Sequence, residues 1–269
     1  MNDDSRTPPS AHPAIAGRER PMADLADAVR QLTALTVTTM APGPVLDEVV
    51  AGLRSAAGSL AAHVPAQPQP RFVEPAEDTA DTGGTGTGTA EKGRSGTDQT
   101  EGITASAGAP ITTSMHASMP YDPVIGRFNP LALPVEITFE PPLAIGTACF
   151  TTPYEGGPGW VHGSAIAATF DIVLTAANHL AGAAGPTVWL TVRFRRPTLV
   201  GVEARFEAEV VESDGRRVTS RGRLVQDGVV CVEAEGEFAV LDPSRIRSVA
   251  ERTVRRRAEQ RGLGRTDGD

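Results

Sequence analysis

The chain is poor in cysteine, in aromatic residues and in long apolar runs. Its two cysteines, Cys149 and Cys231, form neither a disulfide framework nor a metal-binding spacing. They are expected to fill apolar space in a reducing compartment. No apolar run approaches the ~20 residues of a membrane-spanning helix, and the polar, proline-rich start has no signal-peptide core. The sequence therefore predicts a soluble cytoplasmic protein without membrane contact.

The chain also has fewer basic than acidic side chains. The 269 residues include 33 acidic and 25 basic side chains, which gives a formal charge of −8. Nucleic-acid-binding proteins usually carry a basic surface that neutralises phosphates. We therefore expect no nucleic-acid partner.

Three segments are predicted to lack a packed core of their own. Residues 1–20 are polar and proline-rich, and we expect them to be disordered. Residues 65–118 are dominated by Gly, Thr, Ala, Pro and charged side chains, which cannot offset the entropy of ordering, so they are predicted to be a flexible linker. Residues 243–269 are predicted to form a basic C-terminal helix and tail, either solvated or binding a partner.

Residues 21–64 are predicted to form a helical hairpin. Apolar side chains recur at spacings of three and four over residues 22–39, and a second helix is expected from Pro44, with Asp47 and Glu48 near its positive end. Two short amphipathic helices cannot bury their apolar faces alone. They must pack on each other, on the main domain or on a second subunit, as a dimerisation or docking element.

The main domain is predicted to span residues 119–242 and to contain one central helix. This helix follows the Gly-rich stretch from Glu155 and continues to about Asn178. Apolar or small residues occupy all of its sides, so we expect it to be buried all round. Asp171 lies in its middle, where an ionised carboxylate is costly unless something pairs with it or uses it. Asp171 is therefore the first candidate for chemistry.

In the sequence, two strand-like runs precede this helix and four follow it. The runs cover residues 135–140, 143–152, 188–194, 203–210, 217–225 and 230–240, and the last four alternate apolar and polar residues. Asp214-Gly215 and Asp227-Gly228 indicate tight hairpins, and the connections are too short for crossover helices. The predicted fold class is α+β, a curved antiparallel β-sheet wrapped around one long buried helix.

This order of elements and four motifs resemble the hotdog-fold acyl-CoA thioesterases, in particular the PaaI-like branch of the thioesterase superfamily. The motifs are Tyr154-Glu155-Gly156-Gly157-Pro158-Gly159, Val161-His162-Gly163-Ser164 with Asp171, Leu190-Thr191-Val192-Arg193-Phe194-Arg195-Arg196-Pro197, and Ala234-Glu235-Gly236-Glu237-Phe238. The likeness covers roughly residues 121–241. It implies hydrolysis of an acyl-CoA thioester to the free acid and coenzyme A, without metal or other cofactor. It also implies a homodimer or homotetramer whose sites are shared between chains.

The resemblance also assigns catalytic roles. Asp171 corresponds to the general base or nucleophile, and burial is expected to raise its pKa. Backbone N–H groups of Gly163 and Ser164 correspond to the oxyanion hole at the helix start. Thr187 corresponds to a residue that holds the water or orients the carboxylate. The family usually has His-Gly-Gly, whereas this chain has His162-Gly163-Ser164. After the catalytic position the family usually has an acidic or small residue, whereas this chain has Ile172. Both departures bear on substrate range and activity.

The same comparison marks a set of substrate-binding candidates. They are His162, Gly159, Trp160, Trp189, Arg195 and Arg196. His162 is favoured as a cap of the loop rather than a proton carrier. The arginines either meet the phosphates of coenzyme A or pair with Glu across the strands. Trp189 either lines an acyl tunnel or covers the outer face of the sheet.

Other functions remain open on the sequence. Asp171 is also compatible with a structural acid at a subunit interface, which makes a catalytically silent hotdog module that binds acyl-CoA or a protein partner the alternative function. A hotdog enoyl-CoA hydratase would need an Asp and a His a few residues apart. Only His179, eight residues after Asp171, is available for that pairing.

Overall fold

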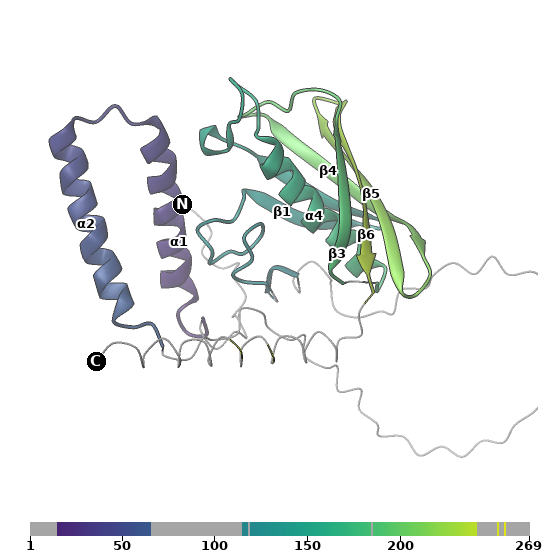
Figure 1. Cartoon of the computed structure of the whole chain (residues 1–269), viewed down its shortest axis with the longest axis horizontal. Helices are drawn as coiled ribbons and strands as arrows, with labels where there is room; N and C mark the ends of the chain where they lie inside the picture. Colours follow the sequence, from purple (N-terminus) through teal and green to yellow (C-terminus); the bar gives the residue numbers. More distant parts are fainter. Residues whose placement is uncertain are drawn as a thin grey trace, which may run out of the picture.

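The computed structural model of the chain describes residues 15–65, 115–117, 119–183 and 185–240, together with Arg252 and Arg256. Figure 1 shows two N-terminal helices standing beside a domain in which strands wrap around one helix. The predictions for residues 1–14, for most of the linker and for nearly all of the C-terminal helix lie outside the described residues. Within the described residues, no helix is long and apolar enough to cross a membrane.

One antiparallel sheet forms the domain, as the alternating sequence patterns predict. Its strands are β1 (Val135–Glu140), β2 (Leu143–Cys149), β3 (Thr187–Phe194), β4 (Glu203–Ser213), β5 (Arg217–Gln226) and β6 (Val229–Ala239). They are hydrogen-bonded in the order β1-β2-β4-β5-β6-β3. Among the described residues, strand β3 pairs only with β6, so its other edge has no partner there. The predicted order of strands around the central helix is confirmed.

The two predicted hairpin turns are present. Asp227 and Gly228 join β5 to β6 with φ angles of 49° and 75°. Two successive positive φ values are the requirement of a tight hairpin turn whose twist matches the flanking strands. Gly215, between β4 and β5, also has a positive φ of 78°. These turns fix the register of β4, β5 and β6, and these three strands supply most of the concave face of the sheet.

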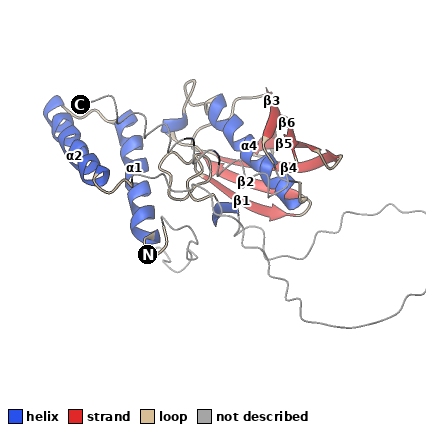
Figure 2. Cartoon of the chain, turned by 60° about the horizontal axis from the view of Figure 1, so that its bottom comes forward, coloured by secondary structure: helices blue, strands red, loops and turns tan. Residues whose placement is uncertain are grey.

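The core lies between this concave face and helix α4 (Gly163–Leu180), which Figure 2 shows against the strands. Phe170 of α4 meets Phe206 of β4 edge to face, with ring centroids 5.0 Å apart, and both are fully buried. Gly146 of β2 lets the helix approach closely, because a Cβ there would lie 2.7 Å from Val173. The close fit of α4 against β2 therefore adds to apolar burial in fixing the position of the central helix.

The prediction that this helix is buried all round is wrong for one side. A stripe containing Ala167, Ala168, Asp171 and Thr175 is only partly buried, and Ser164 and His179 at its ends are exposed. The sheet of one chain covers only the side of α4 that faces it. Small and apolar residues on the uncovered side look the same in a sequence projection as core residues.

Helices α1 (Glu19–Thr38) and α2 (Gly43–Ala61) form the predicted hairpin, but they are attached unequally. Helix α1 buries Ala23 and Ala26, and its Arg30 Nη1 donates to the backbone oxygen of Asn129 at 2.7 Å. Helix α2 buries no residue. The hairpin is thus anchored through α1, while α2 stands on the outside (Figure 1).

Ordered structure extends slightly beyond the predicted boundaries at two places. Ile15, inside the segment expected to be disordered, is fully buried and packs with Ala23 and Phe128. Met115, inside the expected linker, is helical and belongs to the main core. Both are single large apolar side chains in polar surroundings, which composition averaged over a segment does not detect.

Candidate functional site

The loop before α4 is held in place by backbone hydrogen bonds. Gly159, with a φ of 76°, donates its N–H to the Glu155 carboxylate. Val161 donates to the backbone oxygen of Thr198 at 2.8 Å, and His162 donates to that of Tyr154 at 2.7 Å. The loop is therefore tied to the segment that follows β3, and it delivers the first turn of α4 beside the end of that strand.

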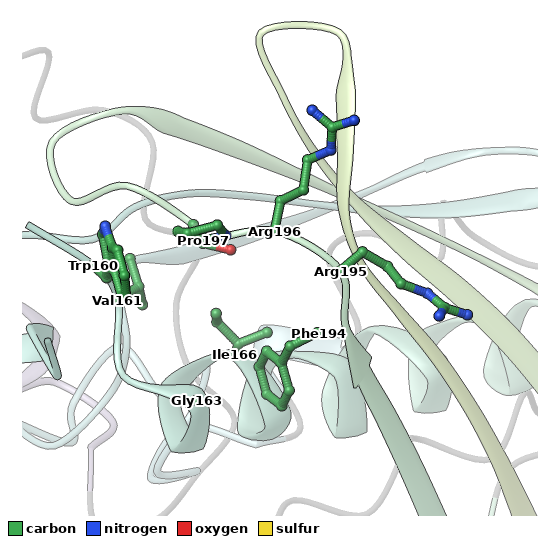
Figure 3. Close-up of a pocket in the computed structure, with 9 residues that line it drawn as sticks. Trp160, Val161, Gly163, Ile166, Phe194, Arg195, Arg196 and Pro197 are labelled. Atoms are coloured by element: carbon green, nitrogen blue, oxygen red, sulfur yellow. The ribbon is translucent and has the colours of Figure 1, made fainter.

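A pocket of about 450 Å³ opens where these segments meet (Figure 3). Its lining comes from the loop, the first turn of α4 and the end of β3, namely Trp160, Val161, Gly163, Ile166, Phe194, Arg195, Arg196, Pro197 and Thr198. The volume lies within the range of small-molecule sites. Two aromatic walls, Trp160 and Phe194, are about half exposed, at 50% and 54%. The pocket is thus apolar, open to solvent and placed at a helix N-terminus.

His162 caps the start of α4 and occupies one of the predicted oxyanion donors. Its Nδ1 accepts the backbone N–H of Ser164 at 3.1 Å and lies 2.7 Å from the Ser164 hydroxyl oxygen. Because a backbone N–H points at Nδ1, this nitrogen is unprotonated and the hydroxyl donates to it as well. The capping role predicted for His162 is confirmed. The N–H of Ser164, however, is not free for an oxyanion.

The N–H of Gly163 remains available. It has no hydrogen-bond acceptor among the described residues, and Gly163 lines the pocket. The first N–H groups of a helix have no partner within the helix and lie at the positive end of its dipole. Gly163 therefore presents one donor, in a favourable field, to whatever occupies the pocket.

Asp171 lies two turns further along α4, on the partly buried stripe. The hydroxyl of Thr187, at the start of β3, donates to Asp171 Oδ1 at 2.6 Å. The structure thus brings together two residues that the sequence resemblance paired. The predicted burial of Asp171 among apolar side chains is wrong, because the stripe that carries it is open on one side. One carboxylate oxygen is fixed by Thr187 and the other has no partner among the described residues.

Asp171 and the pocket are separated along the helix. Gly163 and Asp171 are eight residues apart, which is about 12 Å at 1.5 Å per residue. Neither Asp171 nor Thr187 lines the pocket. A base and an oxyanion donor must each lie within roughly 3 Å of the group they act on. Within one chain, the two halves of the predicted site are therefore too far apart to act directly on the same carbonyl group.

The predicted substrate-binding residues are divided between the pocket and its surroundings. Trp160, Arg195 and Arg196 line the pocket, whereas Gly159 and His162 belong to the loop and the cap beside it. Trp189 is 40% exposed and does not line the pocket. Figure 3 shows both guanidinium groups directed away from the apolar wall formed by Ile166 and Phe194.

Most of the outward-facing arginines pair with glutamates across the sheet. Arg195 Nε lies 2.8 Å from Glu233, and equivalent pairs join Arg221 to Glu209 and Arg223 to Glu207. The cross-strand interpretation is therefore confirmed for these side chains. Arg196 makes no ion pair with another described residue, so it is the pocket cation that is free to meet an anion.

Sequence reasoning did not single out the apolar walls of the pocket. Ile166, Phe194, Pro197 and Thr198 were assigned no role, although three of them flank Arg195 and Arg196 in the sequence. Their proximity to the two arginines was the available signal. Thr198 is 2% exposed, and its hydroxyl has no hydrogen-bond partner among the described residues. No group of three or more His, Cys, Asp or Glu in the described parts of the chain is arranged to hold a metal ion.

Comparison with known proteins relates this geometry to a family. The thioesterase superfamily matches residues 158–233, which include the pocket lining from Trp160 to Thr198 and Asp171. No curated protein matches the chain. The crystal structure of a thioesterase superfamily protein is 28% identical, with a TM-score of 0.62, and the alignment covers 87% of this chain and 97% of that one.

Two further structures share less of the chain. The PaaI protein of E. coli, from the phenylacetic acid degradation operon, is 19% identical with a TM-score of 0.39, over 41% of this chain and 81% of that one. Zebrafish thioesterase superfamily member 2 is 17% identical with a TM-score of 0.38, over 40% and 82%. The match over residues 158–233 and the 28%-identical structure agree with the sheet and helix described above. The domain of this chain therefore has the hotdog fold, and residues 158–233 are similar to the thioesterase superfamily, as the sequence predicted.

Proposed function

We propose that this chain is an acyl-CoA thioesterase, with Asp171 as general base or nucleophile. The observation that carries the proposal is the hydrogen bond from Thr187 to Asp171, on the one side of α4 that the sheet leaves open. The partly buried carboxylate has one oxygen fixed by Thr187, and the other has no partner among the described residues. A fixed carboxylate of this kind suits proton abstraction or direct attack.

Either role leads to the same products. As a base, Asp171 takes a proton from water while the water oxygen bonds to the carbonyl carbon. The carbon–sulfur bond then breaks, and the thiolate of coenzyme A leaves and takes up a proton. As a nucleophile, Asp171 forms a mixed anhydride with the acyl group, and water hydrolyses it in a second step. Coenzyme A enters only as part of the substrate, and the chemistry needs no metal or redox cofactor.

The free N–H of Gly163 is the proposed oxyanion donor. Negative charge on the thioester oxygen grows during attack, and an N–H at the positive end of α4 stabilises it more in the transition state than in the bound substrate. A substrate that fills the pocket and excludes water would lower the local dielectric around that N–H. Arg196 at its rim is the proposed contact for the phosphates of coenzyme A, while Arg195 beside it pairs with Glu233.

The separation of about 12 Å along α4 supports a site shared by two chains. We propose that Asp171 of one chain acts with Gly163 of the partner subunit, in a homodimer or a dimer of dimers. The open edge of β3 favours pairing there, because apolar side chains at this edge are exposed in the single chain. They are Val188 at 47% and Phe194 at 54%. Pairing would cover the stripe that carries Asp171.

The chain's location is proposed on separate grounds. Cys149 and Cys231 are both free, and Cys149 is exposed. An exposed free thiol is typical of reducing compartments, where disulfides are rare. This supports the cytoplasm as the place where the protein works.

One observation favours a second candidate, a silent module that binds acyl-CoA without hydrolysing it. The N–H of Ser164 is engaged by His162, which leaves a single oxyanion donor at the helix start. Losing one donor of an oxyanion hole costs roughly 10²–10³ in kcat in a well-studied protease. The silent module would keep the pocket and bind the substrate, but it would turn over slowly or not at all.

The deciding experiment is release of free thiol from short, medium, long and aromatic acyl-CoAs. Wild type is compared with Asp171→Asn and with Asp24→Asn, which makes the same change on an exposed carboxylate of α1. We expect turnover that collapses only in Asp171→Asn, while mass and circular dichroism stay unchanged. Saturable binding of acyl-CoA without turnover by wild type would instead establish the silent module. Equal turnover by all three proteins would remove Asp171 from the mechanism.

A further inference from the structure

The apolar face of α2 has no partner among the described residues. Six large side chains on this helix are between 41% and 52% exposed, namely Val45, Leu46, Val49, Val50, Leu53 and Leu60. Helix α1 adds Leu25, Val29 and Leu35, at 40%, 38% and 55%, on a side not used to anchor it. The two helices make few contacts with each other. Exposed apolar patches of this kind on a monomer mark interaction surfaces.

The spacing on α2 specifies what kind of partner fits. Leu46, Val50, Leu53, Ala57 and Leu60 follow one another at four, three, four and three residues, which is the seam of a coiled coil. Asp47 and Arg54 each follow a seam leucine directly. They are seven residues apart, so they lie within about 20° of each other around the helix, on one edge of the seam. Neither has an ion-pair partner among the described residues.

Charge complementarity then selects a second copy of this chain. A twofold axis perpendicular to two antiparallel helices brings the same edge of both helices together in reversed order. With the axis close to Ala51, Asp47 of each copy lies opposite Arg54 of the other, so one symmetric contact creates two ion pairs. A parallel arrangement would instead place this edge against the opposite edge of the partner helix, so Asp47 and Arg54 would not meet.

Exposed apolar surface of this kind is what such a contact would bury. The nine apolar side chains on α2 and α1 are each between 38% and 55% exposed. Ala57 on the seam allows the neighbouring helix to approach closely at that point. Since α1 is fixed to the hotdog domain through Arg30, the contact would hold two whole chains together and not merely two tails.

We propose that α2 is a self-association helix, which packs antiparallel on the α2 of a second copy with α1 flanking it. The contact is separate from the pairing proposed at β3, and it does not depend on the thioesterase chemistry. Where both contacts involve the same two chains, α2 reinforces the dimer. Where they involve different chains, α2 joins dimers into a tetramer.

The test uses charge reversal in the full-length chain. Asp47→Arg makes this edge of α2 wholly basic and Arg54→Asp makes it wholly acidic. Glu48→Arg is the matched control, because it makes the same charge change one residue away on the side opposite the seam. Each of the first two variants is expected to weaken the α2 contact about tenfold or more, measured by sedimentation equilibrium at low salt. Glu48→Arg and the double variant Asp47→Arg/Arg54→Asp should associate like wild type.

Mixing provides an independent readout. Asp47→Arg chains mixed with Arg54→Asp chains restore both ion pairs only in mixed complexes. Native mass spectrometry should therefore show mixed complexes in excess of the 1:2:1 ratio that random exchange gives. Because α2 buries nothing within its own chain, these variants should keep the circular dichroism of wild type. Wild-type association by both single variants, together with a 1:2:1 mixture, would overturn the proposal.

Discussion

Replacing Gly163 with proline tests the oxyanion donor with little other disturbance. Gly163 is the first residue of α4, a position at which proline is favoured and where no N–H is used within the helix. His162 before it already has the extended backbone that proline requires of its neighbour, with φ −64° and ψ 135°. Gly163→Pro therefore removes the proposed donor and leaves the helix start intact.

The expected loss follows from the role of that N–H. Because the N–H of Ser164 is engaged by His162, Gly163 supplies the only backbone donor proposed for the oxyanion. Removing one such donor lowers kcat roughly 10²–10³-fold, with a smaller change in KM. The assay is thiol release from the best acyl-CoA of the panel, under saturating and limiting substrate.

Gly163→Ala is the matched control. Both variants add a Cβ, which would lie 3.1 Å from Cζ of Phe194, a half-exposed ring that is able to shift. Only the alanine variant keeps the N–H. We expect Gly163→Ala to retain most of its kcat while Gly163→Pro loses nearly all of it. Equal kcat in the two variants would refute the role of this N–H.

The same variant tests whether the site is shared. In a mixed dimer of Gly163→Pro and Asp171→Asn chains, one of the two shared sites contains neither change. Random reassociation of equal amounts should then restore about a quarter of wild-type activity. A site built within one chain would restore nothing, because every chain carries a defect. A mixture no more active than its components, with exchange confirmed by mass, therefore contradicts the shared site.

Two further variants probe the surroundings of the site. Thr187→Val removes the hydrogen bond to Asp171 at nearly constant volume and should lower kcat about tenfold with little change in KM, whereas Thr187→Ser should stay near wild type. Hydrogen bonds from Arg205, and also from Arg223, lower the pKa of Glu207 in the folded state. Its contribution to stability is therefore complete above the unfolded pKa of about 4.5 and is lost as the pH falls through the lower folded value. Glu207→Gln should reduce the free energy of unfolding by about 1 kcal/mol at pH 7 and by almost nothing in strong acid, measured by urea unfolding at both pH values.

The sheet was predictable because its determinants are local. Alternation of apolar and polar residues specifies which face of β4, β5 and β6 is buried, and register follows from the turns. Asp227-Gly228 predicts a hairpin through its tolerance of positive φ, and the angles of 49° and 75° bear this out. The single long apolar helix then has only the concave face to cover.

The hydrogen bonding at the start of α4 was not predictable to the same degree. The sequence pairs Gly163 and Ser164 as equivalent donors, because each has one backbone N–H near the helix start. Which of them is free depends on the rotamer of His162, whose Nδ1 turns onto Ser164. A difference of a few ångströms in one side chain therefore decides whether the site has one donor or two. Only atomic coordinates contain that information.

The wrong prediction for α4 and the exposed face of α2 have a common physical cause. A projection of apolar residues reports what the sequence is adapted to bury, whereas the structure of one chain reports what that chain alone covers. Asp171 lies on a side of α4 that has the composition of a core but that the single chain leaves partly exposed. The same mismatch recurs at the edge of β3 and along α2, both rich in apolar side chains that are about half exposed. If association covers these surfaces, the environment in which Asp171 works exists only in the assembled protein. Dilution to concentrations below the dissociation constant of the assembly should therefore reduce activity per chain before it unfolds the domain.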